Sequence, residues 1–278
     1  MKIDLHSHTS FSDGRLSPEK LVSLAKKRKV DVLSVTDHDT VEGLPQIQLF
    51  CEEAGIEWIP GIEISSRWGE EEVHLLAYFI DWRNAEFLNF LEEQRRDRLT
   101  RLDAMIARLN EHGVLIEKKD VEATLIDTRT PGRPHVAQAL VRLGYAPNMK
   151  EAFRLYLSPG NSGYVPRAFP EASSVLQKIK NCGGIASLAH PGLLRNKSIP
   201  DLLKNEGLPA IEAYHPNHKK SQMQAFAYWA KENGLLVTGG SDFHGLKGEK
   251  NSALGSLPMP VEALEKLRNA AHRQNHKM

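Results

Sequence analysis

Short apolar runs recur along this chain, and segments with helical periodicity separate several of them. Seven of these runs are predicted to be strands: Ile3–His8, Val30–Thr36, Trp58–Ile64, Val73–Phe79, Ile185–His190, Ile211–Tyr214 and Leu235–Gly239. Strands that are apolar along their whole length and alternate with helices are typical of a parallel sheet or barrel, because helices bury such strands. One of these helices is predicted to begin after Ser17, with Pro18 in its first turn. The pattern predicts an α/β fold.

A long segment interrupts this alternation. Between residues 84 and 164 the sequence is helical and charged, with apolar residues at helix-compatible spacings, including Phe87, Leu91, Leu102, Ile106 and Leu109. We therefore predict that residues 1–83 and 165–278 form the main α/β domain. Residues 84–164 are predicted to form a helical insertion between the fourth and fifth strands.

The overall composition excludes several classes of protein. The net charge of +1 provides no basic field for nucleic acid, so any recognition of a polyanion has to be local. No apolar run approaches the roughly 20 residues that a membrane-spanning helix needs. Cys51 and Cys182 lie far apart and match no ligand spacing, so a disulfide scaffold is not expected. We expect a soluble, cytoplasmic protein with no membrane association and no obligate protein partner.

Good metal ligands gather at or beside the ends of the predicted strands. His6 and His8 are two residues apart, and so are Asp242 and His244, so both members of a pair point the same way on a strand. The full set contains nine residues: His6, His8, Asp13, His38, Glu63, His74, His190, Asp242 and His244. In a parallel barrel the carboxyl ends of the strands converge on one face. A lone histidine more often has a structural role, but nine such groups favour a metal centre.

Nine ligands exceed the needs of one ion, and imidazole together with carboxylate suits zinc, manganese or iron. The sequence therefore predicts a cluster of two or three divalent ions. A carboxylate such as Glu63 is expected to bridge them.

Four short motifs carry a family resemblance. They are His-x-His at His6, Thr-Asp-His-Asp at His38, Ala-His-Pro at His190 and Ser-Asp-Phe-His at Asp242. Together they resemble the motifs of the polymerase and histidinol phosphatase (PHP) superfamily, and the resemblance spans almost the entire chain. It implies a distorted (β/α)7 barrel, the PHP fold, whose active site is capped by the insertion.

The resemblance also implies three ions with defined ligands. The implied sets are His6, His8, Glu63 and Asp242 for the first ion, Glu63, His74 and His190 for the second, and Asp13, His38 and His244 for the third. Manganese is the expected metal, with iron and zinc as alternatives.

Two further segments resemble the corresponding segments of a stand-alone bacterial branch of the superfamily. They are Gly-Arg-Pro-His at residues 132–135 and Gly-Tyr-Val-Pro-Arg at residues 163–167. Members of this branch hydrolyse nucleoside 3′,5′-bisphosphates and trim 5′-phosphorylated RNA ends. The resemblance makes Arg133 and Arg167 candidate phosphate-binding residues, since a guanidinium binds phosphate bidentately. His135 and His215 are candidates for substrate contact.

Each of these assignments has an alternative. Arg133 and Arg167 could instead be solvated or paired internally, and His135 could be the N-terminal residue of a buried helix. His215 could support the metal ligands without touching substrate. The stretch from Arg95 to Arg101 is mixed with acidic residues, which favours a solvated, ion-pairing helix face over a role in guiding RNA.

The expected function is hydrolysis of the 3′-phosphate of a small nucleotide such as adenosine 3′,5′-bisphosphate, with 5′-to-3′ exonuclease action on short 5′-phosphorylated RNA as a further activity. A hydroxide that bridges the ions is expected to attack phosphorus. Asp242, Arg133 and His215 are the catalytic candidates, and Asp242 is expected to accept a proton from the attacking water.

Three alternative functions stay open. A histidinol-phosphate phosphatase shares the barrel, although the long insertion favours the nucleotide branch. A phosphodiesterase or proofreading nuclease of the kind attached to polymerases is less favoured, because this sequence contains no polymerase segment. A non-catalytic, metal-binding interaction module is the alternative of another class, and the complete ligand set argues against it.

Overall fold

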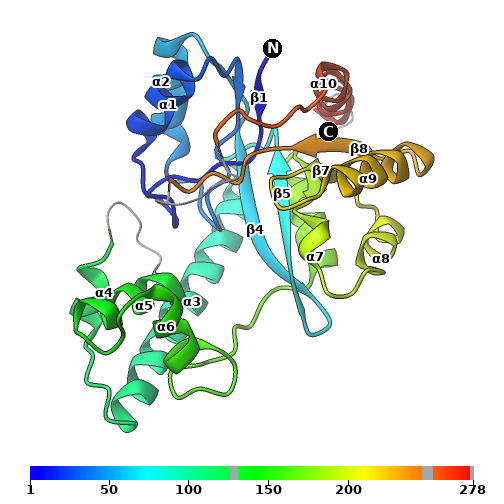
Figure 1. Cartoon of the computed structure of the whole chain (residues 1–278). Coiled ribbons are helices and arrows are strands. Elements are labelled where there is room, and N and C mark those ends of the chain that lie inside the picture. Colours follow the sequence, from blue (N-terminus) through cyan, green and yellow to red (C-terminus); the bar gives the residue numbers. More distant parts are fainter. Residues whose placement is uncertain (126–130, 246–252, 276–278) are drawn as a thin grey trace. The chain divides into compact units, whose positions relative to one another are not determined.

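The computed structural model of the chain describes residues 1–125, 131–245 and 253–275. The chain divides into two compact units, the first containing Met1–Leu88 with Phe169–Met278 and the second containing Asn89–Ala168. The described strands belong to the first unit (Figure 1). Within the described ranges, no helix combines the length and the apolar character that crossing a membrane requires.

The described strands form two sheets. A parallel sheet contains, in order, β1 (Ile3–Asp4), β2 (Val32–Leu33) and β3 (Glu57–Trp58). A larger sheet contains, in order, β4 (Gly61–Trp68), β5 (Glu71–Tyr78), β6 (Ile185–Leu188), β7 (Ala210–Tyr214) and β8 (Leu236–Gly239).

The predicted strand over Trp58–Ile64 is divided between the two sheets. Trp58 ends β3, and β4 begins at Gly61. Pro60 lies between them, and proline has no N–H to donate to a strand ladder, so the first pairing ends there. The described residues therefore carry eight strands where seven apolar runs were predicted.

The strand order is parallel only in part. β4 and β5 are antiparallel, β5 and β6 are antiparallel, and the pairs from β6 to β8 are parallel. Only Gly69 and Glu70 separate β4 from β5, which is too short for a parallel crossover and gives the long hairpin in Figure 1. The parallel arrangement that the alternation predicted is therefore wrong at β5.

Backbone hydrogen bonds join the two sheets. The N–H of Leu5, just after β1, donates to the carbonyl of Gly239 at the end of β8, with an N–O distance of 3.2 Å. The N–H of Asp39, beyond β2, donates to the carbonyl of Glu63 in β4 at 2.9 Å. The first bond brings the segment after β1 beside the end of β8, and the second brings the segment after β2 beside β4. The segments that follow β1, β2 and β8 carry six of the nine predicted ligands.

Helices cover the sheets of the first unit. They are α1 (Pro18–Lys27), α2 (Leu44–Ala54), α7 (Ala172–Asn181), α8 (Ile199–Asn205), α9 (Lys220–Glu232) and α10 (Val261–Asn275), with a 3-10 turn η2 (Pro191–Leu193) after β6. The hydroxyl of Ser17 caps α1, as predicted, by accepting from the N–H of Lys20. Leu21 and Ala25 on the buried face of α1 belong to one apolar cluster with Leu33 of β2, which fixes the helix against the sheet.

The described part of the second unit is helical. Its helices are α3 (Ala85–Glu111), which begins in the first unit, α4 (Lys118–Glu122), α5 (Arg133–Arg142) and α6 (Met149–Ala152), and α6 continues as a π-helical segment, η1 (Phe153–Leu157). Leu102 and Leu109 of α3 pack in one core with Val136 and Leu140 of α5. This unit therefore has an apolar core of its own.

Candidate metal centre

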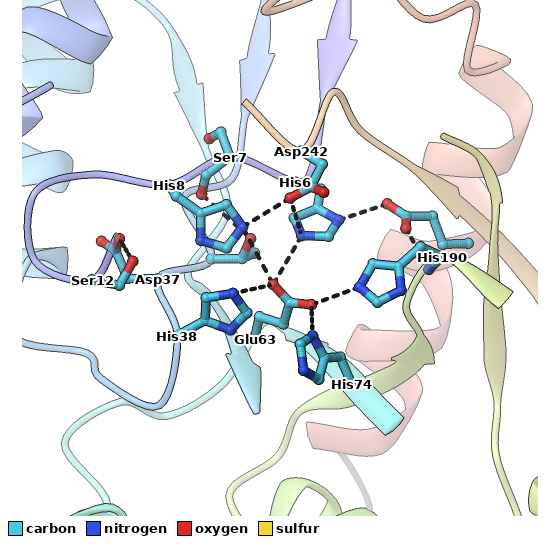
Figure 2. Close-up of polar contacts among 12 residues, drawn as sticks. His6, Ser7, His8, Ser12, Asp37, His38, Glu63, His74, His190 and Asp242 are labelled. Carbon is cyan, nitrogen blue, oxygen red and sulfur yellow. Dashed lines mark hydrogen bonds and ion pairs between the residues drawn. The ribbon is translucent and has the colours of Figure 1, made fainter. Parts of the chain in front are cut away.

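The nine predicted metal ligands lie together in the first unit, although they come from distant parts of the sequence. Figure 2 labels these members of the set: His6, His8, His38, Glu63, His74, His190 and Asp242. His6 and His8 follow β1, Asp13 lies between β1 and α1, His38 follows β2, Glu63 lies in β4, His74 lies in β5, His190 follows β6, and Asp242 and His244 follow β8. The two sheets thus deliver ligands to one place.

Glu63 lies at the centre of this cluster and is only 1% exposed (Figure 2). Imidazole nitrogens surround both of its oxygens. Around Oε1 they are His74 Nδ1 at 2.9 Å and His190 Nε2 at 3.1 Å, and around Oε2 they are the Nε2 atoms of His6 at 3.0 Å, His8 at 3.3 Å and His38 at 3.5 Å. A carboxylate has about four lone-pair directions. Five imidazoles therefore cannot all donate to it, and ions placed between the groups fit the arrangement better.

Asp242 and Asp13 bring further carboxylate oxygens to the cluster. Asp242 Oδ1 lies 3.2 Å from His8 Nε2 and 3.3 Å from His6 Nε2. Asp13 Oδ1 lies 3.2 Å from His244 Nε2. Each carboxylate therefore faces the imidazoles that it was expected to join.

The geometry groups these ligands in sets that follow the implied ion partition only in part. Ligand atoms that lie within 4.8 Å of one another form the sets His6, His8, Glu63 and Asp242; His8, Asp13, His38 and His244; and His38, Glu63 and His74. The first of these sets is identical to the ligand set implied for the first ion. The second contains the three ligands implied for the third ion, with His8 in addition. The remaining set matches the second ion except that it contains His38 in place of His190. His190 nevertheless approaches the same Glu63 oxygen as His74. Which side chains bind ions stays a prediction.

His8 tests whether these residues fit metal ions. It is fully buried, and neither of its ring nitrogens has a hydrogen-bond partner among the described residues, although Nε2 faces Glu63 and Asp242. A buried polar atom without a partner costs about 1–3 kcal/mol. A divalent ion would satisfy the Nε2 lone pair and the facing oxygens together. The residues present therefore fit a divalent metal cluster.

The electrostatics of the cluster favour a bound cation. Burial on its own raises the pKa of Glu63, but His38 and His6 lower it well below its usual range. Burial lowers the pKa of His8, yet the contacts with Asp242 and Glu63 raise it to about 10. Without a metal, a proton on His8 therefore offsets part of the carboxylate charge, and a metal ion can replace this proton.

The Thr-Asp-His-Asp motif also supplies two carboxylates that hold loops in place. Asp37 accepts from the Thr9 N–H at 2.7 Å, from Thr9 Oγ1 at 2.5 Å and from Ser12 Oγ at 2.5 Å. Asp39, which has a φ of 54°, accepts from the N–H of Ser65 at 2.7 Å. Both carboxylates are buried, and these bonds tie the ligand-bearing loops to one another.

Glu212 is a carboxylate of this site that the sequence analysis missed. It is fully buried in β7, where Oε1 lies 2.9 Å from His6 Nδ1 and Oε2 accepts from the N–H of His190 at 2.8 Å. Burial raises the pKa of this carboxyl, but His6 and His215 outweigh burial and lower it. The available signal was one acidic residue inside the apolar run Ile211–Tyr214.

His215 is buried beside Asp242. Its Nδ1 accepts from the N–H of Asn217 at 3.2 Å, so the proton of the neutral ring lies on Nε2. That Nε2 is 3.3 Å from Asp242 Oδ2. His215 therefore presents an N–H group to the cluster.

Cations gather within the second unit. Arg133 begins α5, and Arg167 lies near the end of the unit. Burial and then the nearby charges of Arg133 and Arg167 lower the pKa of Arg101 to about 10. Arg101 Nε donates to the Val165 carbonyl at 2.8 Å. Arg101 is therefore part of a basic cluster and is not on a solvated face.

The beginning of the same basic stretch agrees with the ion-pairing expectation, because Arg95 and Arg96 both bond to Glu92. At the start of α5, His135 Nδ1 accepts from the N–H of Gly132 at 3.0 Å. This bond agrees with the alternative given for His135, in which it is an N-terminal residue of a helix.

Comparisons with known proteins agree with this geometry. The family model described as "PHP domain" matches residues 4–147. A 5′-3′ exoribonuclease of Haemophilus influenzae is 34% identical, with 87% of this chain and 90% of that protein covered. A 3′,5′-nucleoside bisphosphate phosphatase of Chromobacterium violaceum is 33% identical, with 87% of each chain covered. A crystal structure from Bifidobacterium adolescentis, of a protein proposed to be a metal-dependent phosphoesterase, superposes with a TM-score of 0.86 at 32% identity over 96% of both chains.

Proposed function

Starting from the finding that this chain belongs to the PHP domain family, we propose that it removes the 3′-phosphate from nucleoside 3′,5′-bisphosphates. At a coarser level the chain is a metal-dependent phosphoesterase, a hydrolase of phosphoric esters. The observation that carries the proposal is the buried Glu63 carboxylate between imidazoles of several strands (Figure 2).

We propose that the nine clustered side chains hold two or three divalent ions, with manganese preferred over iron or zinc. When bound, such ions make water more acidic and neutralise charge on the phosphate. Asp242 is positioned to accept a proton, because its Oδ1 faces the cluster between His6 and His8. His215 carries an N–H at Nε2 that can donate a hydrogen bond to the oxygen of the departing alcohol and so stabilise the negative charge that develops there.

We propose that the second unit supplies the cations that bind substrate phosphate. Arg133 and Arg167 are the candidates, and their charges contribute, after burial, to the lowered pKa of the neighbouring Arg101. An anionic ligand relieves repulsion within such a cluster. His135 is a weaker candidate for substrate contact, since its Nδ1 already accepts a backbone bond. In this proposal residues 84–164 cap the active site. The two sheets form the distorted (β/α)7 barrel of the family, with β3 and β4 together in the place of one barrel strand.

The name of one relative supports exoribonuclease action as a second activity. The Haemophilus protein is named a 5′-3′ exoribonuclease and is as similar to this chain as the bisphosphate phosphatase is. We therefore include trimming of short 5′-phosphorylated RNA in the proposal. Both activities require recognition of a phosphate group that is not cleaved.

A substrate panel with manganese-loaded protein tests the proposed function. Adenosine 3′,5′-bisphosphate should have the highest kcat/KM, and the product should be 5′-AMP, identified by phosphorus NMR. The panel also contains histidinol phosphate, adenosine 3′-monophosphate and a 5′-phosphorylated oligoribonucleotide. A preference for histidinol phosphate would establish the first alternative, and bound metal without any turnover would establish the non-catalytic module.

Arg133→Ala is expected to raise KM and to lower kcat together. The loss in kcat/KM should be about 10- to 100-fold, since a hydrogen bond to a charged group contributes about 1.5–3 kcal/mol. Steady-state kinetics with adenosine 3′,5′-bisphosphate measures the effect. Arg96→Ala is the control, because Arg96 is exposed and pairs with Glu92 on α3. Unchanged kcat and KM in Arg133→Ala would remove this residue from the site.

A further inference from the structure

Glu212 contacts two of the predicted ligands from outside their cluster. Oε1 lies 2.9 Å from His6 Nδ1, the ring atom opposite the Nε2 that faces Glu63. Oε2 accepts from the backbone N–H of His190 at 2.8 Å. The carboxylate has no exposed surface, so both bonds are made without competition from solvent.

The bond to His6 determines which ring nitrogen can bind a metal. An ionised carboxylate only accepts hydrogen bonds, so Nδ1 of His6 has to carry the proton that it donates to Glu212. In the neutral ring the lone pair then lies on Nε2, which is directed at Glu63 and Asp242. Metal-bound histidines in proteins commonly have such a carboxylate partner.

The bond to His190 acts on the backbone. His190 has φ 31° and ψ 54°, in the left-handed region that non-glycine residues rarely adopt, and Pro191 follows it. A hydrogen bond from its N–H to a buried carboxylate stabilises this conformation, which directs the ring toward Glu63.

We propose that Glu212 is a positioning residue that fixes the His6 tautomer and the His190 turn at once, and so prepares two ion sites from one buried carboxylate. The inference rests on the proposed function, since it assumes that the cluster binds metal. Glu212, His6 and His215 also lie close enough to form a ligand set of their own. Direct hydrogen bonds already occupy both Glu212 oxygens and His215 Nδ1, which favours positioning over a further ion.

Glu212→Gln tests the proposal because glutamine has the same shape but only one accepting oxygen. If that oxygen accepts from His190, the amide NH2 must donate to His6 Nδ1, which moves the ring proton to Nε2 and removes the lone pair that a metal needs. If the oxygen instead accepts from His6, the His190 N–H loses its acceptor. The folded full-length protein is dialysed to remove metal and is then titrated with manganese in a calorimeter. The manganese affinity of the variant should be about 10- to 100-fold lower than that of the wild type.

Glu232→Gln is the matched control, since it makes the same substitution at an exposed position at the end of α9, and its manganese affinity should equal that of the wild type. Equal affinity in Glu212→Gln would overturn the inference alone, whereas a wild-type protein without metal affinity would overturn the proposed function.

A measurement on the wild type keeps the inference testable if Glu212→Gln does not fold. In zinc-loaded protein with 15N-labelled histidine, the NMR signal of His6, assigned from its loss in His6→Gln, should show a proton on Nδ1. A proton on Nε2 would overturn the inference. So would one additional tightly bound ion that is lost on replacing Glu212, because Glu212 would then be a ligand.

Discussion

Glu63→Gln is expected to reduce phosphoester hydrolysis by roughly 10,000-fold or more, because loss of ion binding removes several kcal/mol of transition-state stabilisation and each 1.4 kcal/mol corresponds to tenfold. The substitution keeps the shape of the side chain and removes its charge. Glu63 faces imidazoles at both oxygens, so more than one ion should be affected. The measurement is kcat with adenosine 3′,5′-bisphosphate at saturating manganese.

Thermal unfolding separates loss of metal from loss of fold. A ligand that binds only the folded state at 100 times its Kd stabilises that state by about 2.7 kcal/mol. Manganese should therefore raise the Tm of the wild type, and chelation should reverse the increase. In Glu63→Gln the increase should be absent, although the variant should still melt cooperatively.

Glu53→Gln is the control for this experiment, since Glu53 lies exposed on α2. It should keep both the turnover and the manganese-dependent rise in Tm. Near-normal turnover of metal-replete Glu63→Gln would contradict the central role of this carboxylate.

The clustering of the nine candidate ligands could be anticipated from sequence because local rules place each of them. Most lie within a strand or directly after one, and strand ends converge wherever strands pair side by side. The pairs His6 with His8 and Asp242 with His244 needed only the two-residue spacing. The clustering of the nine ligands could be predicted even though the predicted direction of β5 was wrong.

The features that were missed depend on tertiary contacts. Glu212 resembles any residue of a short strand until folding places its oxygens beside His6 and His190. Arg101 carries the same charge as Arg96, and only packing distinguishes the half-buried member of a basic cluster from the exposed, ion-paired arginine. The boundary between β3 and β4 was marked by Pro60, but an apolar run on both sides concealed it.

His215→Ala should lower kcat by about 100- to 1,000-fold for a nucleoside 3′-phosphate, the range typical of removing one hydrogen-bond donor from developing negative charge. Alanine removes the N–H that His215 presents at Nε2. The departing ribose oxygen is a poor leaving group and gains negative charge as the bond to phosphorus breaks. The side chain therefore matters most when the alcohol is least acidic.

The choice of leaving group distinguishes stabilisation of the departing oxygen from support of the metal ligands. With 4-nitrophenyl phosphate, whose phenolate spreads its negative charge over the ring, kcat of His215→Ala should be close to that of the wild type. An equal loss for both substrates would mean that His215 supports the metal ligands through Asp242, to which its Nε2 is 3.3 Å away. The manganese content of the variant, measured in parallel, would then be reduced as well. The geometry favours a hydrogen bond to the departing oxygen, because the bond from the Asn217 N–H keeps Nδ1 an acceptor and leaves the Nε2 N–H on the side of the cluster.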